Sequence, residues 1–149
     1  MPRGPRAVLE MLAAIPLFSS CDQHELMSVA SIGVEVRALP GRVLAGPGQK
    51  ALKSSFILSG LARCEIDGRT VATLGPGDYF GHVPFLHNGT DRATVVAETP
   101  MEILVVDTGE FASLLADAPS MSRKITEALT QQLREMPGAG EAVRTAQAP

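Results

Sequence analysis

Histidine and cysteine are the side chains of this sequence best able to bind a metal ion or attack a substrate. The histidines are His24, His82 and His87, and the cysteines are Cys21 and Cys64. None of them stands in a Cys-x-x-Cys or Cys/His spacing of the kind that metal sites use. We therefore expect both cysteines to be reduced and unpaired, and we expect no metal site.

Serine could supply a nucleophile, and two adjacent pairs occur, Ser19-Ser20 and Ser54-Ser55. Neither pair lies in a nucleophile-elbow sequence, and neither has the histidine and aspartate companions that activate a serine. We therefore assign no residue of this chain to catalysis.

The composition is that of one globular domain, because 45% of the 149 residues are hydrophobic and 19% are charged. A formal net charge of -3 provides no excess of lysine and arginine to neutralise nucleic-acid phosphates. The amphipathic segment 7–15 is too short and too interrupted for a signal sequence or a membrane span. We expect a cytoplasmic protein that binds neither nucleic acid nor membrane.

The elements that must position any site begin with two predicted helices. Segment 6–15 places apolar residues on one helical face, and Pro16 should end that helix. Asp22 is a suitable N-cap for a second helix that carries Glu25 in its first turn. Both helices precede the predicted strands.

Short β-branched runs alternate with glycine-bearing turns from Ile32 to Val106, which is typical of an all-β sandwich or roll. Asp67-Gly68 separates two of these runs and predicts a tight hairpin, because glycine accepts the positive φ of a two-residue turn. We predict seven strands, which cover residues 33–39, 42–44, 55–58, 61–66, 70–74, 94–97 and 101–106.

Helical periodicity returns after Val106, with a short helix followed by a longer one that Pro119 opens. The longer helix, Ser120 to Met136, has a narrow apolar face, so it either folds back over the roll or meets a protein partner or a second copy of the chain. Residues 137–149 are rich in Ala, Gly and Pro without periodicity and are predicted to be a disordered tail. The domain then covers residues 1–136.

Five segments, in order and over about residues 12–136, resemble the cyclic nucleotide-binding domains of bacterial catabolite-type regulators, kinase regulatory subunits and gated channels. The resemblance implies a mainly β fold with flanking helices, an antiparallel double-stranded β-helix that forms a jelly-roll-like β-roll. It also implies cAMP or cGMP as the ligand. The segments are Ile15-Pro16-Leu17-Phe18, Leu39-Pro40-Gly41-Arg42-Val43-Leu44, Phe56-Ile57-Leu58-Ser59-Gly60, Leu74-Gly75-Pro76-Gly77-Asp78-Tyr79-Phe80-Gly81 and Arg92-Ala93-Thr94-Val95-Val96-Ala97.

A phosphate-binding cassette is the functional part of this resemblance. In family members it reads Phe-Gly-Glu, an aliphatic residue, Ala or Gly, and Leu, followed after a loop by Arg, Ser or Thr, and Ala. A short helix after the glycine offers backbone N–H groups to the phosphate, the Glu accepts from the ribose, and the Arg binds phosphate oxygens. The matching residues here are Phe80, Gly81, His82, Val83 and Pro84, then Asp91, Arg92 and Ala93.

The cassette of this sequence departs from that pattern at three positions. His82 replaces the ribose-binding carboxylate, and a neutral imidazole accepts one hydrogen bond at most. Pro84 stands where a backbone N–H usually faces the phosphate, and proline has none. A gapless alignment puts Asp91 at the arginine position, whereas one additional loop residue restores Arg92 but leaves the next strand one residue short.

These departures predict weak or no binding of cAMP and cGMP, because loss of the charged partner of a buried phosphate costs about 2 to 5 kcal/mol. The predicted function is a non-catalytic regulatory or interaction module that acts through protein contacts, since the residues after Met136 leave no room for a DNA-reading domain. Two alternatives stay open. One is a working cyclic nucleotide sensor that uses Arg92 and His82, and the other is a cupin-like metal enzyme, whose His-x-His ligand pattern is absent.

Overall fold

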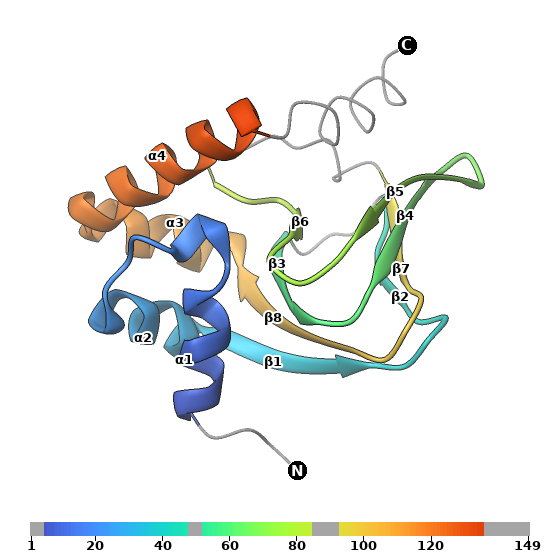
Figure 1. Ribbon diagram of the computed structural model, residues 1–149, viewed down its shortest axis with the longest axis horizontal. Coiled ribbons are helices and arrows are strands. Elements are labelled where there is room, and N and C mark those ends of the chain that lie inside the picture. The colour runs from blue at the N-terminus through green and yellow to red at the C-terminus, as the bar shows by residue number, and fades with distance from the viewer. Residues whose placement is uncertain (1–4, 48–51, 85–92, 136–149) are drawn as a thin grey trace.

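We describe the chain from a computed structural model, which defines residues 5–47, 52–84 and 93–135. Four helices gather at one end of the molecule, and a β-roll forms the other end (Figure 1). Over these residues the helices are α1 (Pro5–Ala13), α2 (Gln23–Ile32), α3 (Thr108–Asp117) and α4 (Pro119–Glu135), with a 3-10 turn η1 (Pro16–Phe18) between the first two. The predicted disordered tail, 137–149, lies outside the described residues.

Two four-stranded sheets, whose printed strand pairs are all antiparallel, make the β-roll. The first sheet has the order β1-β8-β3-β6 and extends to the helices, and the second has the order β2-β7-β4-β5. The mainly β fold with flanking helices, predicted from the sequence, is therefore confirmed. The strands are β1 (Gly33–Ala38), β2 (Val43–Ala45), β3 (Lys53–Ser59), β4 (Ala62–Ile66), β5 (Arg69–Leu74), β6 (Tyr79–Gly81), β7 (Thr94–Ala97) and β8 (Met101–Asp107).

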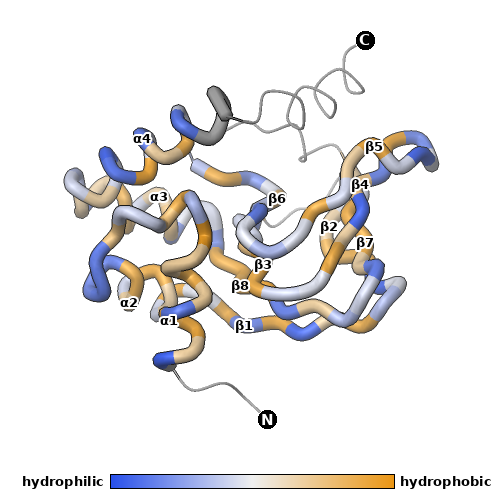
Figure 2. The backbone as a smooth tube through the Cα atoms, viewed as in Figure 1, coloured by the Kyte–Doolittle hydropathy of each residue, from blue (hydrophilic) through white to orange (hydrophobic). Residues whose placement is uncertain are grey.

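The hairpin predicted at Asp67-Gly68 is confirmed. Ile66 pairs with Arg69, and the two residues between them have φ angles of 53° and 77°. Two positive φ angles define a type I′ turn, whose twist matches that of the strands it joins. The tip of this β4–β5 hairpin is hydrophilic and projects from the roll on the side away from the helices (Figure 2).

The N-terminal helices follow the predicted signals with one correction. Asp22 caps α2 in a reciprocal capping box, because its side chain accepts from the Glu25 amide at 2.8 Å and the Glu25 side chain accepts from the Asp22 amide at 2.8 Å. The first helix, however, ends at Ala13, two residues earlier than the predicted end. Ile15 precedes Pro16 and is extended, with ψ of 124°, because the proline ring disfavours the helical conformation of the residue before it.

The strand prediction needs two corrections. The seven predicted strands are present, β7 with the predicted ends and the others with shifted ends, and an eighth strand, β6, was not predicted. β6 has three residues, Tyr79–Gly81, too few to show an alternating pattern, and it exists because it pairs with β3 far back in the sequence. β2 begins at Val43 instead of residue 42.

The central strands β3 and β8 are buried on both faces and so join two hydrophobic clusters. Phe56 and Leu104 face the helical end, whereas Ile57 and Ile103 face the second sheet. Three phenylalanines meet in the helical cluster: the ring of Phe56 lies 5.0 Å from that of Phe18 and 5.8 Å from that of Phe111, both edge to face. β3 therefore connects the roll interior to the helices.

The last helix folds back onto its own chain over the part that the structure describes. Met121, Ile125 and Leu129 of α4 are each at most 4% exposed, and they share the helical cluster with Leu17 and Phe18 of η1. The narrow apolar face predicted from the sequence is thus covered within the chain. It packs against the helical end of the molecule and not over the roll. Met136, the predicted last residue, lies outside the described residues.

Candidate functional site

The first half of the cassette lies where the first sheet meets the helices. Phe80 is fully buried inside the roll, and Val83 is buried in the helical cluster. Between them Gly81 ends β6, and the side chain of His82 is exposed to solvent. Pro84 is half-buried and begins a turn. The buried side chains of Phe80 and Val83 therefore anchor the cassette on either side of the exposed His82.

The second half of the cassette is only partly described. Ala93 is 1% exposed and lines the roll interior together with Val95 and Ala97 of β7. Asp91 and Arg92 lie outside the described residues. The short helix expected directly after Gly81 does not begin there, because His82 and Val83 are in neither helix nor strand, and residues 85–92 lie outside the described residues. Which of Asp91 and Arg92 occupies the phosphate-binding position accordingly stays a prediction.

Glycine is required at position 81 because the backbone passes directly over β3. Its φ is +90°, and a Cβ atom there would collide with the carbonyl oxygen of Lys53. The amide of the next residue, His82, donates to that same Lys53 oxygen at 2.9 Å. The glycine of the cassette therefore permits a close approach that fixes the start of the following segment.

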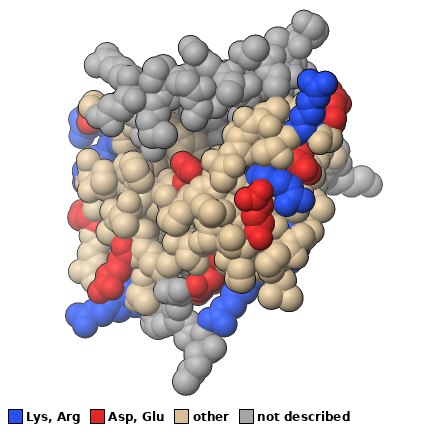
Figure 3. Space-filling view, turned by 45° about the vertical axis from the view of Figure 1, so that its right-hand side comes forward, with Lys and Arg blue, Asp and Glu red and all other residues tan. Residues whose placement is uncertain are grey.

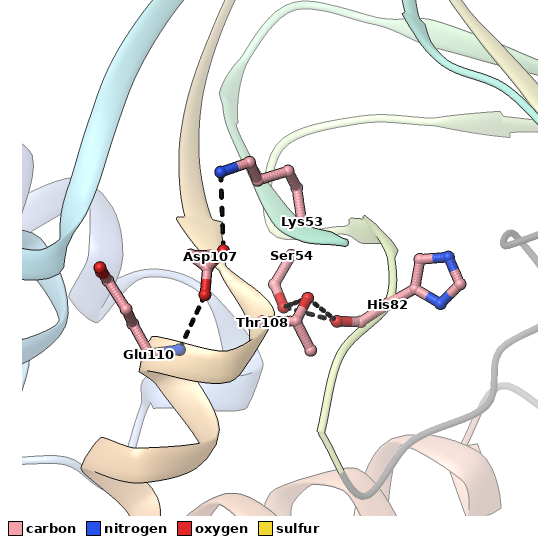
Figure 4. A network of polar contacts seen from close by, with 6 residues as sticks. All are labelled: Lys53, Ser54, His82, Asp107, Thr108 and Glu110. Atoms are coloured by element: carbon pink, nitrogen blue, oxygen red, sulfur yellow. Dashed lines mark hydrogen bonds and ion pairs between the residues drawn. The ribbon is translucent and has the colours of Figure 1, made fainter. Parts of the chain in front are cut away.

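Two hydroxyl groups hold the carbonyl oxygen of His82. Ser54 Oγ on β3 donates to it at 2.7 Å and Thr108 Oγ1, the first residue of α3, donates to it at 2.6 Å (Figure 4). The hydroxyl oxygens lie 3.3 Å apart. The imidazole ring points away from both hydroxyls, so the main chain of His82 is held while its side chain faces solvent.

The start of α3, next to the His82 carbonyl, also carries a helix cap and an ion pair. Asp107 caps α3 by accepting from the Glu110 amide at 2.9 Å, and its other carboxylate oxygen lies 3.7 Å from Lys53 Nζ (Figure 4). Both partners of this ion pair are more than 40% exposed, so it contributes little stability. The Thr108 amide also donates to the Leu52 carbonyl at 3.1 Å, which ties the start of α3 to the start of β3.

Burial shields titratable groups both in the roll and at the helical end. Asp78 closes the turn before β6 by accepting from the Gly75 amide at 2.8 Å, and burial raises the pKa of this carboxyl group. Burial and the nearby Asp78 charge raise the pKa of the Cys64 thiol to about 11, and burial together with Glu25 does the same for Cys21. Both cysteines are free, as predicted.

Among the described side chains, His, Cys, Asp and Glu form no group of three that could hold a metal ion. On the face shown in Figure 3, basic and acidic side chains lie beside one another in several places. Within residues 5–47, 52–84 and 93–135, no helix has the length and apolar character to cross a bilayer.

The sequence did not predict that Ser54 and Thr108 hold the carbonyl oxygen of His82. Ser54 was considered only as a nucleophile and lay outside the predicted strand 55–58, yet it is 0% exposed on β3 between Lys53 and Ser55. A buried hydroxyl needs a partner, but the polar neighbours of Ser54 gave no signal in the sequence that it would be buried. Its partner is His82, 28 residues away in sequence, and no local pattern indicates that pairing.

A β-roll with helices at one end and a glycine-led segment at their junction defines the class of domain. The sequence model of the cyclic nucleotide-binding domain family matches residues 35–118, more than half of the chain. The chain therefore belongs to the cyclic nucleotide-binding domain family, as its five motifs implied.

The relatives are longer proteins, and this chain matches only part of each. The chain is 29% identical over 114 residues to the cAMP-dependent protein kinase regulatory subunit of Schizosaccharomyces pombe, covering 76% of this chain and 28% of that protein. It is 30% identical over 135 residues to the Pycsar effector protein PaPycTIR of Pseudomonas aeruginosa, covering 90% of this chain and 44% of that protein. The chain thus spans less than half the length of both relatives.

A solved structure with the same fold is the regulatory subunit of a cAMP-independent protein kinase A from Trypanosoma brucei. It has a TM-score of 0.73 and 22% identity, and the match covers 96% of this chain and 51% of that chain. A variant of that subunit with three substitutions, one of which introduces an arginine, is bound to cAMP in its A site, with the same score and coverage.

Proposed function

We propose that this chain is a non-catalytic regulatory module that uses the cyclic nucleotide-binding fold without tight binding of cAMP or cGMP. The observation that carries this proposal is the environment of His82. Its main chain is fixed by Lys53, Ser54 and Thr108, so its position is well defined, yet its exposed side chain is an imidazole where the family places a carboxylate. The site therefore keeps its scaffold and lacks the ribose acceptor.

Pro84 supports the same conclusion. It is half-buried two residues after His82, at the point where family members offer a backbone N–H to the phosphate. Proline cannot donate there. If Asp91 occupies the arginine position, a carboxylate also replaces the cation, and loss of a charged partner costs about 2 to 5 kcal/mol. A cost of this size weakens binding by one to several orders of magnitude, at about 1.4 kcal/mol for each factor of ten.

The regulatory subunit from Trypanosoma brucei provides a precedent in the same fold. It belongs to a kinase described as cAMP-independent, and a variant with an introduced arginine is bound to cAMP. Loss of nucleotide dependence is therefore compatible with an intact β-roll. We infer that the present chain has changed in a comparable way, at His82, Pro84 and Asp91.

The output of such a module passes through protein contacts, and α4 is the element that we assign to them. Its apolar residues Met121, Ile125 and Leu129 are buried against the chain itself. Its opposite face carries exposed polar side chains, including Arg123 and Glu127. A partner protein or a second copy of the chain would therefore meet a polar helix surface, and we expect such a contact to depend on salt concentration.

Restoring the cassette tests the proposal. The variant H82E/P84A/D91R supplies an acceptor, an N–H donor and a charged fork, so it should bind cAMP with a Kd below about 100 μM in isothermal titration calorimetry. The matched control is H82E/P84A, which repairs the first two positions and leaves Asp91 and Arg92 in place. We expect this control to bind at least tenfold more weakly. Equal binding by both variants would place the phosphate partner elsewhere and contradict the proposal.

A further inference from the structure

The carbonyl oxygen of His82 receives hydrogen bonds from two different elements. Ser54 Oγ reaches it from β3 at 2.7 Å, and Thr108 Oγ1 reaches it from α3 at 2.6 Å (Figure 4). Each hydroxyl has one proton to give, and a carbonyl oxygen has two lone pairs to receive them. Both acceptor positions of the His82 carbonyl are therefore used by side chains that are distant in sequence.

Burial makes at least one of these bonds costly to lose. Ser54 is 0% exposed, so if His82 moves away its hydroxyl cannot turn to water and keeps only the longer contact with Thr108 Oγ1 at 3.3 Å. Exchanging the 2.7 Å hydrogen bond to His82 for this longer contact costs free energy that an exposed hydroxyl would recover from water. The segment after Gly81 is thus held in one position for as long as β3 and α3 keep theirs.

The Thr108 end of this arrangement leads directly into the helical core. Thr108 is the first residue of α3, and Phe111 and Leu115 of the same helix are buried in the cluster that contains Phe18 and Phe56. A rigid turn of helix separates the hydroxyl from the Phe111 ring. A displacement of residue 82 would therefore disturb the packing of α3 against its neighbours.

We propose that Ser54 and Thr108 form a hydroxyl latch, the pair of side chains that couples the cassette segment to α3. The latch transmits the position of residues 82–84 to the helical end of the domain. It acts in the chain without any ligand, so it goes beyond the proposed function and does not depend on whether a nucleotide binds.

Native-state hydrogen exchange measured by mass spectrometry tests the latch on the full chain without nucleotide. Ser54→Ala and Thr108→Val each remove one hydroxyl with little change in volume. We expect exchange of residues 79–84 and of α3 to rise together, by about tenfold in either variant. The double variant should raise exchange in both segments at least as much as either single variant, because it removes both hydrogen bonds to the one carbonyl. Exchange in β4, in the second sheet, should stay unchanged.

Two further variants separate the latch from general loss of stability. Thr108→Ser keeps the hydroxyl and should exchange like the unmodified chain. Thr126→Val removes a threonine hydroxyl that donates to the Ser122 carbonyl at 2.8 Å on the exposed side of α4, and it should leave residues 79–84 unchanged. A rise confined to one of the two segments, a uniform rise that includes β4, or a Thr108→Ser variant that behaves like Thr108→Val would each overturn the proposal.

Discussion

The ammonium group of Lys124 on α4 lies 2.8 Å from Glu25 Oε1 on α2, the same oxygen that accepts the hydrogen bond from the Asp22 amide. One carboxylate thus completes the capping box of α2 and holds α4. Residues 99 positions apart are joined in this way. The ion pair fixes the side of α2 on which the last helix lies.

Removing this contact should loosen α4. Lys124→Met keeps most of the aliphatic stem and deletes the charge, so we expect a lower Tm and faster hydrogen exchange in α4. The hydrogen bond to Glu25 raises the pKa of Lys124 above its ordinary value of 10.5. The stabilisation is therefore fully present below pH 10.5 and is lost as the pH rises through the raised pKa. The Tm difference between the two proteins should be constant at neutral pH and shrink above pH 10.5.

That ion-pair account would fail if the Tm difference were as large at pH 11 as at pH 8, because an uncharged lysine cannot form the pair. Thermal unfolding of both proteins in one buffer series provides the comparison.

The glycine of the cassette can be tested against a matched glycine elsewhere in the roll. Gly81 and Gly41 have nearly the same φ, +90° and +91°, but a Cβ at Gly41 would meet no atom within 4 Å. Gly41→Ala should therefore cost about 1 to 2 kcal/mol of unfolding free energy from backbone conformation alone. Gly81→Ala carries the same cost plus the collision with the Lys53 carbonyl, about 1 to 3 kcal/mol more. Denaturant unfolding measures both.

Equal costs for the two alanine variants would mean that β3 can move away from residue 81, and the close approach described for the cassette would then be unimportant for stability.

Alkaline pH should destabilise the fold through its buried thiols. The pKa of both Cys21 and Cys64 is raised from 9.0 to about 11, chiefly by burial. Between these values the folded chain keeps protons that the unfolded chain releases, so stability is present below pH 9 and falls as the pH rises toward 11. Cys64→Ala should have a shallower decline of Tm over this range than the unmodified chain. An unchanged slope would show that other groups dominate alkaline unfolding.

Local signals in the sequence predicted local structure well. Asp22 with Glu25 indicated a capping box, and Asp67-Gly68 indicated a two-residue hairpin, because each motif contains all the groups that it needs within four residues. The five motifs likewise predicted the β-roll and the family. Strand β6 was missed because its three residues become a strand only by pairing with β3.

The site was less predictable than the fold for the same reason. His82 and Pro84 were identified from the resemblance, but the hydroxyls that hold His82 come from β3 and α3, 28 and 26 residues away. Their convergence depends on the register of three strands, which no single segment encodes. The position of Asp91 or Arg92 opposite a phosphate depends on the register of β7 in the same way.

Calorimetric titration of the unmodified chain with cAMP and with cGMP tests the central claim most directly. We predict no saturable heat up to about 1 mM nucleotide, which corresponds to binding weaker than about -4 kcal/mol. If the unmodified chain does bind, the parallel titration of Arg92→Ala identifies the register, because loss of binding would assign the phosphate to Arg92 and retained binding would not. Binding with a micromolar Kd that Arg92→Ala abolishes would contradict the account and show that the domain is a working cyclic nucleotide sensor.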